Sequence, residues 1–169
     1  MITRPAMHAL LCMAGTILLT ATVVAAIPGA PADARDQLAF TFHPPPVSPG
    51  TLAGILAANL PAAGLPLLAA AFVTHTPPTL RAGLDLLVLV VLVPNMLLIG
   101  VAVGAYGPRL AAYLTHLPLE LAGLAIAAGA YLHARRPTDR SAWTLAGPAA
   151  VAASCLLLAA VIETYTPPT

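Results

Sequence analysis

The sequence has little charge and no lysine. Charged residues make up 8% of the 169 residues, whereas soluble domains carry roughly a quarter, and all seven basic residues are arginine. Aromatic residues are also scarce, at 5%, and the formal net charge is only +1. The composition therefore excludes a water-exposed surface of ordinary size, and it lacks the basic and aromatic signature of a nucleic-acid partner.

Several catalytic motifs are absent as well. There is no glycine-rich phosphate loop with its lysine and no Gly-x-Ser-x-Gly sequence, which argues against an ATPase or a serine hydrolase. The two cysteines, Cys12 and Cys155, lie far apart and indicate neither a disulfide framework nor a thiolate metal site. We therefore expect no cofactor, no bound metal and no enzymatic activity.

What the sequence does contain is long apolar runs. Hydrophobic residues make up 59% of the chain, and its mean hydropathy is +0.90. A helix that crosses a bilayer needs about 20 mainly apolar residues, because its backbone must satisfy its own hydrogen bonds. Five stretches meet this requirement, which predicts an all-α membrane bundle of five helices in one domain, residues 1–169: 6–27, 52–73, 84–105, 110–132 and 143–162.

Prolines divide the chain into regular and irregular parts. The second predicted span contains Pro61 and Pro66, and the fourth contains Pro118, so we expect both to be kinked or broken. The connection 28–50 is rich in proline, which predicts an extended, poorly helical surface segment.

The distribution of arginine predicts the orientation. Cytoplasmic loops carry an excess of basic residues, and an N-terminus in the cytoplasm places Arg4, Arg81 and the three arginines of 135–140 inside. This N-in, C-out topology puts the segment 28–50 outside the cell. The first span resembles a signal peptide, because Arg4 precedes it and small residues near 24–26 resemble a cleavage site. Its apolar stretch of about 20 residues is long for a signal peptide and favours retention as a span.

Four polar residues fall within the predicted spans: Asn59, Asn95, His116 and Glu120. Ionisable groups at membrane depth are unfavourable, and they usually face the interior of a bundle. His116 and Glu120 are four residues apart and share one helix face, which Gly123 continues. We expect a buried polar cluster in which Asn59 or Asn95 is a partner of Glu120.

This cluster has an architectural and a chemical interpretation. In the first, the side chains tie helices together, which is the commoner role of asparagine in membranes. In the second, His116 and Glu120 carry protons or bind a metal. Asp85 and Glu163 lie near predicted span ends, where we expect them to reach toward the membrane surface.

The polar motifs resemble those of the stage II sporulation protein M family. The runs 95–100 and 116–120 share its spacing, with Asn first in one run and His four residues before Glu in the other. A methionine and a leucine follow this Asn and His, where the family typically has glycine. The resemblance covers about 52–132, where Asn59 matches an asparagine of the family's earlier helix.

The resemblance implies a non-catalytic subunit or scaffold of the prokaryotic cell membrane. The founding family member works with peptidoglycan-degrading proteins of the cell envelope, so we expect the lipid bilayer and other membrane or envelope proteins as partners. Self-association is an alternative. Two further functions stay open from the residues: a small transporter or channel component that uses His116 and Glu120, and an intramembrane metalloenzyme, which would need a third protein ligand.

Overall fold

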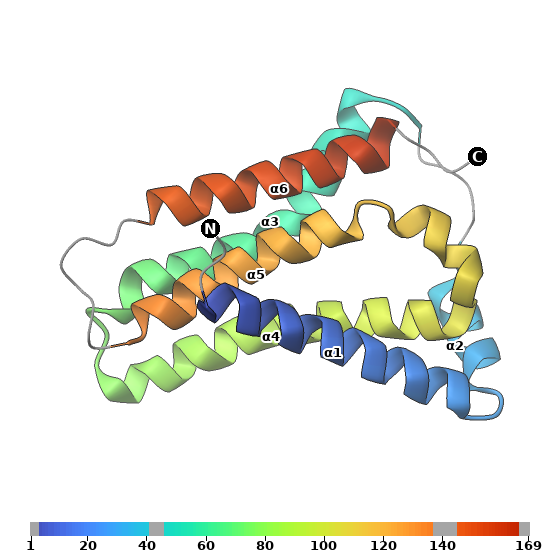
Figure 1. Ribbon diagram of the computed structural model, residues 1–169, viewed down its shortest axis with the longest axis horizontal. Helices are drawn as coiled ribbons and strands as arrows, with labels where there is room; N and C mark the ends of the chain where they lie inside the picture. The colour runs from blue at the N-terminus through green and yellow to red at the C-terminus, as the bar shows by residue number, and fades with distance from the viewer. Residues whose placement is uncertain (1–3, 41–45, 137–144, 166–169) are drawn as a thin grey trace.

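The computed structural model describes residues 4–40, 46–136 and 145–165 (Figure 1). Every regular element in these ranges is a helix. In chain order they are α1 Arg4–Ala26, α2 Ala30–Leu38, α3 Pro49–Val73, α4 Pro78–Tyr106, the 3-10 helix η1 Gly107–Leu114, α5 Leu117–Ala134 and α6 Ala146–Tyr165.

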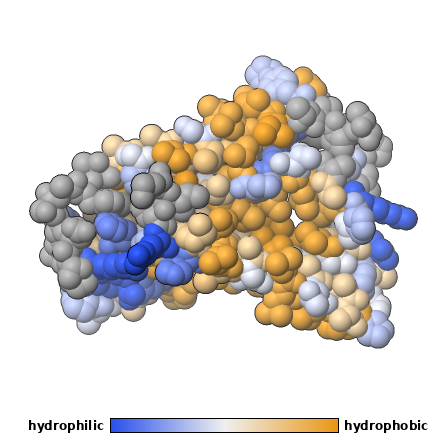
Figure 2. Space-filling view, viewed as in Figure 1, coloured by the Kyte–Doolittle hydropathy of each residue, from blue (hydrophilic) through white to orange (hydrophobic). Residues whose placement is uncertain are grey.

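Five of these helices, α1, α3, α4, α5 and α6, are long and apolar enough to cross a membrane. This confirms the prediction of an all-α, multi-pass membrane bundle. The shortest, α5, has 18 residues and a length of about 27 Å, close to the thickness of bilayer hydrocarbon. Figure 2 shows hydrophobic residues over most of the middle of the molecule, with hydrophilic residues gathered toward its two ends.

The fourth span differs from its prediction. It begins at Leu117 and not near residue 110, because α4 ends at Tyr106 and η1 follows. Gly107, which caps α4, has a φ of 56°, a conformation that favours glycine. Pro118 occupies the first turn of α5 and does not kink it, because N–H groups in the first turn have no acceptor within the helix. In α3 the helix continues through Pro61 and Pro66.

The described part of the proline-rich connection is more helical than predicted, because it contains α2. Gly29 precedes this helix with a φ of 83°, and a proline stands in its first turn. The guanidinium of Arg35 donates to the carbonyl of Ala105 at 3.3 Å, and the backbone N–H of Phe40 donates to the Tyr106 hydroxyl at 3.2 Å. These bonds join the segment to the end of α4.

Helix α5 is the centre of the bundle and packs against α1, α3 and α6. Glycines make two of these contacts close. A Cβ added at Gly123 would lie 3.1 Å from the Ala152 carbonyl oxygen of α6, and one added at Gly129 would lie 2.6 Å from Cα of Ala6 on α1. Small residues thus let the helix backbones approach one another.

The spans run alternately between two ends of the bundle. The starts of α1, α4 and α6 lie at one end with the C-terminal ends of α3 and α5 (Figure 1). We call it the Arg135 end, after the residue that follows α5. The opposite end, which carries α2 and η1, is called the α2 end.

Candidate functional site

The candidate site begins at the N-terminus of α5, near the α2 end. His116 is the residue that caps this helix, and its carbonyl oxygen accepts hydrogen bonds from the N–H groups of Leu119 and Glu120 at 3.0 and 3.2 Å. The first turn of α5 therefore holds the backbone of His116 in line with the helix. The side chains of His116 and Glu120 come to the same face, as their spacing predicts.

Helix α3 supplies the third residue. Nδ2 of Asn59 donates a hydrogen bond of 2.6 Å to Oε1 of Glu120. Asn59 lies ten residues after the start of α3, and it reaches Glu120 because α3 packs beside α5. One carboxylate oxygen of Glu120 thus has a fixed partner on another span.

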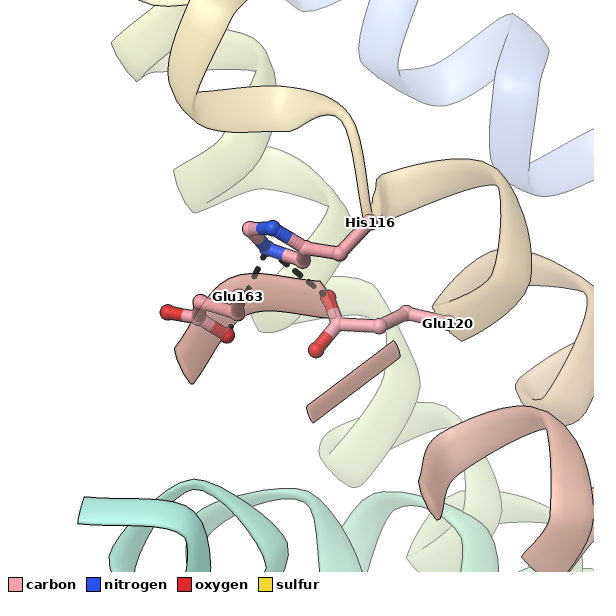
Figure 3. A group of neighbouring side chains, drawn as sticks. All are labelled: His116, Glu120 and Glu163. Carbon is pink, nitrogen blue, oxygen red and sulfur yellow. Dashed lines mark ion pairs between the residues drawn. The ribbon is translucent and has the colours of Figure 1, made fainter. Parts of the chain in front are cut away.

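Helix α6 supplies a fourth residue, Glu163, which is not among the four residues of the predicted cluster. Its Oε2 lies 3.6 Å from Nε2 of His116, and Oε2 of Glu120 lies 3.8 Å from the same nitrogen (Figure 3). Helix α6 extends to Tyr165, beyond the predicted span end at residue 162, so Glu163 lies inside the helix. The sequence feature that could have identified Glu163 is its position: it is an acidic residue directly after the predicted fifth span, within one helical turn of its end.

The cluster is largely enclosed by the bundle and more open on one side. The side chains of His116 and Glu120 are 13% and 14% exposed, whereas that of Glu163 is 32% exposed. One ligand-type atom from each of the three residues lies within 4.8 Å of the others. Two carboxylates and an imidazole at this spacing can share protons or hold a cation.

Asn95 is not part of this cluster. Its side chain is exposed on α4, where Nδ2 donates to the carbonyl oxygen of Val91 at 2.7 Å. The preceding turn of its own helix satisfies this donor, so the residue needs no partner on another span. Of the two asparagines considered for Glu120, only Asn59 reaches it.

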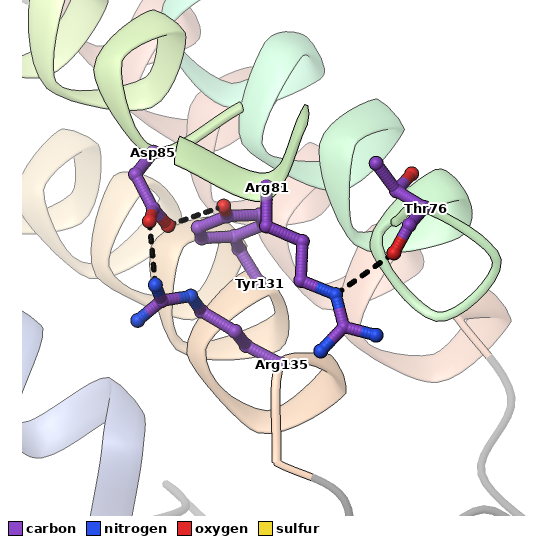
Figure 4. Close-up of polar contacts among 5 residues, drawn as sticks. All are labelled: Thr76, Arg81, Asp85, Tyr131 and Arg135. Atoms are coloured by element: carbon purple, nitrogen blue, oxygen red, sulfur yellow. Dashed lines mark hydrogen bonds and ion pairs between the residues drawn. The ribbon is translucent and has the colours of Figure 1, made fainter. Parts of the chain in front are cut away.

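A second polar group lies toward the Arg135 end (Figure 4). The Tyr131 hydroxyl donates to Oδ1 of Asp85 at 2.6 Å, and the Arg135 guanidinium contacts Oδ2 at 2.6 Å. Nearby, Nε of Arg81 donates to the Thr76 carbonyl at 2.9 Å. Asp85 therefore does more than reach toward the membrane surface, because it joins α4 to α5.

An apolar groove of about 420 Å³ runs between α1, α4 and α5. Cys12 and Thr16 of α1 and Leu89 of α4 belong to its lining, and Asp85 and Tyr131 also contribute to it. Cys12 and Leu89 are exposed, so the groove is accessible from the side of the bundle.

No family model, no curated protein and no solved structure matches this chain.

Proposed function

We propose that the chain is a non-catalytic subunit of the prokaryotic cell membrane, which holds a partner membrane protein in an envelope-associated complex. The resemblance to the stage II sporulation protein M family supports a scaffold of this kind. The proposed orientation is N-in and C-out, which turns the α2 end toward the exterior and toward the cell envelope.

The observation that carries this proposal is the groove between α1, α4 and α5. It lies alongside the apolar middle of spanning helices, and most of its lining is apolar. The occupant that we propose is a transmembrane helix of the partner protein. A helix can contact the apolar lining along its length and bring a polar side chain to Asp85 or Tyr131.

The exposed surface of α1 favours a helix over a lipid chain. Cys12, Gly15 and Thr16 are small residues on this helix, and a Cβ added at Gly15 would meet nothing within 4 Å. The Thr16 hydroxyl donates to the Cys12 carbonyl at 2.9 Å, so it is satisfied without a ligand. Small residues separated by one turn are typical of surfaces where a second helix approaches closely.

Site-specific photocrosslinking tests the occupant. A photoreactive amino acid replaces Leu89 in the groove, and in the matched control it replaces Leu60, which is 67% exposed on α3. We expect the probe at Leu89 to form an adduct with one envelope or membrane protein, identified by mass spectrometry, and the probe at Leu60 to label lipid. Adducts with lipid alone, or with a second copy of the chain, would contradict a partner helix.

A variant whose groove is filled by a large side chain tests whether the groove holds the partner. Cys12→Phe introduces a large side chain into the groove, whereas Gly54→Phe introduces one at an exposed position of α3 with open space around it. We expect the first variant to lose the Leu89 adduct and the co-purifying partner, and the second to keep both. Equal recovery of the partner by both variants would count against the groove.

A further inference from the structure

We infer that His116, Glu120 and Glu163 form a binding site for one divalent transition-metal ion. The site lies at the N-terminal end of α5 and the C-terminal end of α6, and it shares no residue with the lining of the groove. This inference is therefore independent of the partner proposed above. It supplies the third protein ligand that His116 and Glu120 lack as a pair.

The distances within the cluster suit an ion better than direct hydrogen bonds. Nε2 of His116 lies 3.8 Å from Oε2 of Glu120 and 3.6 Å from Oε2 of Glu163. Both distances exceed the range of a hydrogen bond between nitrogen and oxygen, which ends near 3.2 Å. The imidazole nitrogen therefore faces two carboxylate oxygens without direct contact.

A metal ion accounts for this separation. Zn²⁺ binds nitrogen and carboxylate oxygen at about 2.0 to 2.2 Å, so two ligands at a tetrahedral angle lie about 3.4 Å from each other. The two distances from His116, 3.6 and 3.8 Å, are slightly larger than this value, and all three ligand atoms lie within 4.8 Å of one another. Binding of an ion would therefore require the three ligand atoms to move closer together.

The charge of the group also favours a divalent cation. When Glu120 and Glu163 are both ionised and the imidazole is neutral, the group carries a charge of −2. A net negative charge inside an apolar bundle is unfavourable unless it is compensated. One divalent ion brings the sum to zero, with the imidazole in the neutral form whose Nε2 can bind metal.

Asn59 acts as a positioning residue for this site. Its hydrogen bond of 2.6 Å holds Oε1 of Glu120, while the other oxygen, Oε2, lies on the side of His116. Metal ligands commonly have such a partner, which orients the carboxylate before the ion binds. The asparagine thus joins α3 to a site whose ligands come from α5 and α6.

The ligand set indicates the class of metal. One imidazole and two carboxylates suit Zn²⁺, Mn²⁺ or Fe²⁺, whereas a copper(I) site would favour thiolate or thioether sulfur. Glu163, 32% exposed, forms the most open side of the site. A water molecule can complete the coordination from this side, as in zinc sites with three protein ligands.

Metal titration of the full chain in mild detergent tests the site. The protein is stripped with a chelator and titrated with Co²⁺, whose visible absorption reports its coordination, and Zn²⁺ is then added in competition. We expect the absorption to saturate at one Co²⁺ per chain and Zn²⁺ to abolish it. Wild-type protein without saturable absorption would overturn the inference, and this result depends on no variant.

Substitutions identify the ligands. Glu163→Gln changes the least buried of the three residues and preserves its size, so we expect circular dichroism to show intact helices and Co²⁺ affinity to fall at least about tenfold. His116→Gln should have the same effect on affinity. Asp36→Asn, on the exposed surface of α2, is the control and should bind as wild type. Unchanged affinity in a folded Glu163→Gln protein would exclude this site.

Discussion

Nδ2 of Asn59 lies 2.6 Å from Oε1 of Glu120, a bond that joins α3 to α5 across 61 positions of the chain. The carboxylate is mostly enclosed, with 14% of the side chain exposed. Nothing in the hydrocarbon of a bilayer can replace the amide donor, so the bond orients Glu120 and connects two spans. Through this hydrogen bond, α3 contributes a residue to the candidate site.

We expect Asn59→Leu to lower stability by about 0.6 to 2 kcal/mol, because Glu120 loses its donor while it stays enclosed. Thermal unfolding in mild detergent measures this change. Adding Glu120→Leu to the same protein should recover part of the loss, since both members of the pair are then apolar. A single variant as stable as wild type would show that the bond is unimportant for the fold.

At the Arg135 end, two donors share the carboxylate of Asp85 but differ in burial. Tyr131 is 3% exposed as a residue, whereas the side chain of Arg135 is 48% exposed. We expect Tyr131→Phe to cost about 1 to 2 kcal/mol and Arg135→Ala less than about 1 kcal/mol, because water screens the exposed ion pair. Unfolding temperatures of the two variants test the order, which would be wrong if Arg135→Ala were the more damaging.

The contact between α5 and α1 depends on the absence of a side chain at Gly129. A Cβ there would lie 2.6 Å from both N and Cα of Ala6, and these backbone atoms cannot rotate away. We expect Gly129→Ala to lower stability by about 1 to 3 kcal/mol through displacement of α1. Gly64→Ala is the matched control on α3, where an added Cβ meets nothing within 4 Å. Equal unfolding temperatures for the two variants would contradict the close packing.

The proposed topology is tested with single cysteines in a chain that carries Cys12→Ala and Cys155→Ala. Val47 is 57% exposed and lies two residues before α3, near the α2 end. His75 is exposed in the turn after α3, at the Arg135 end. In intact cells, an impermeant thiol reagent should label Val47→Cys, and it should label His75→Cys only after permeabilisation. The reverse pattern would place the N-terminus outside.

Local rules were sufficient for much of this architecture. Apolar length identified the five spans, and a spacing of four residues brought His116 and Glu120 to one face of a helix. Polarity at membrane depth also singled out Asn59, which reaches Glu120. These features follow from single helices and from the properties of the bilayer.

The remaining features depend on tertiary structure or on turns. Glu163 joins the cluster only because α6 packs antiparallel to α5 and extends past the predicted span end. Asn95 was indistinguishable from Asn59 by depth, but its donor is satisfied one turn back at Val91. Proline content alone favours an extended segment at 28–50, but a proline is compatible with the first turn of a helix, and α2 has a proline there. Arg140, which the topology places inside, and the start of the fifth predicted span at 143–144 lie outside the described residues.

The central position of α5 has a consequence for biosynthesis. The three helices around it are α1 and α3, which precede it in the chain, and α6, which follows. A nascent chain that has inserted α5 therefore exposes the Gly123 face to lipid, and His116 and Glu120 still lack Glu163. The arrival of α6 covers that face and completes the cluster in one step. A chain that ended before α6 would leave the Gly123 face of α5 uncovered and His116 and Glu120 without Glu163.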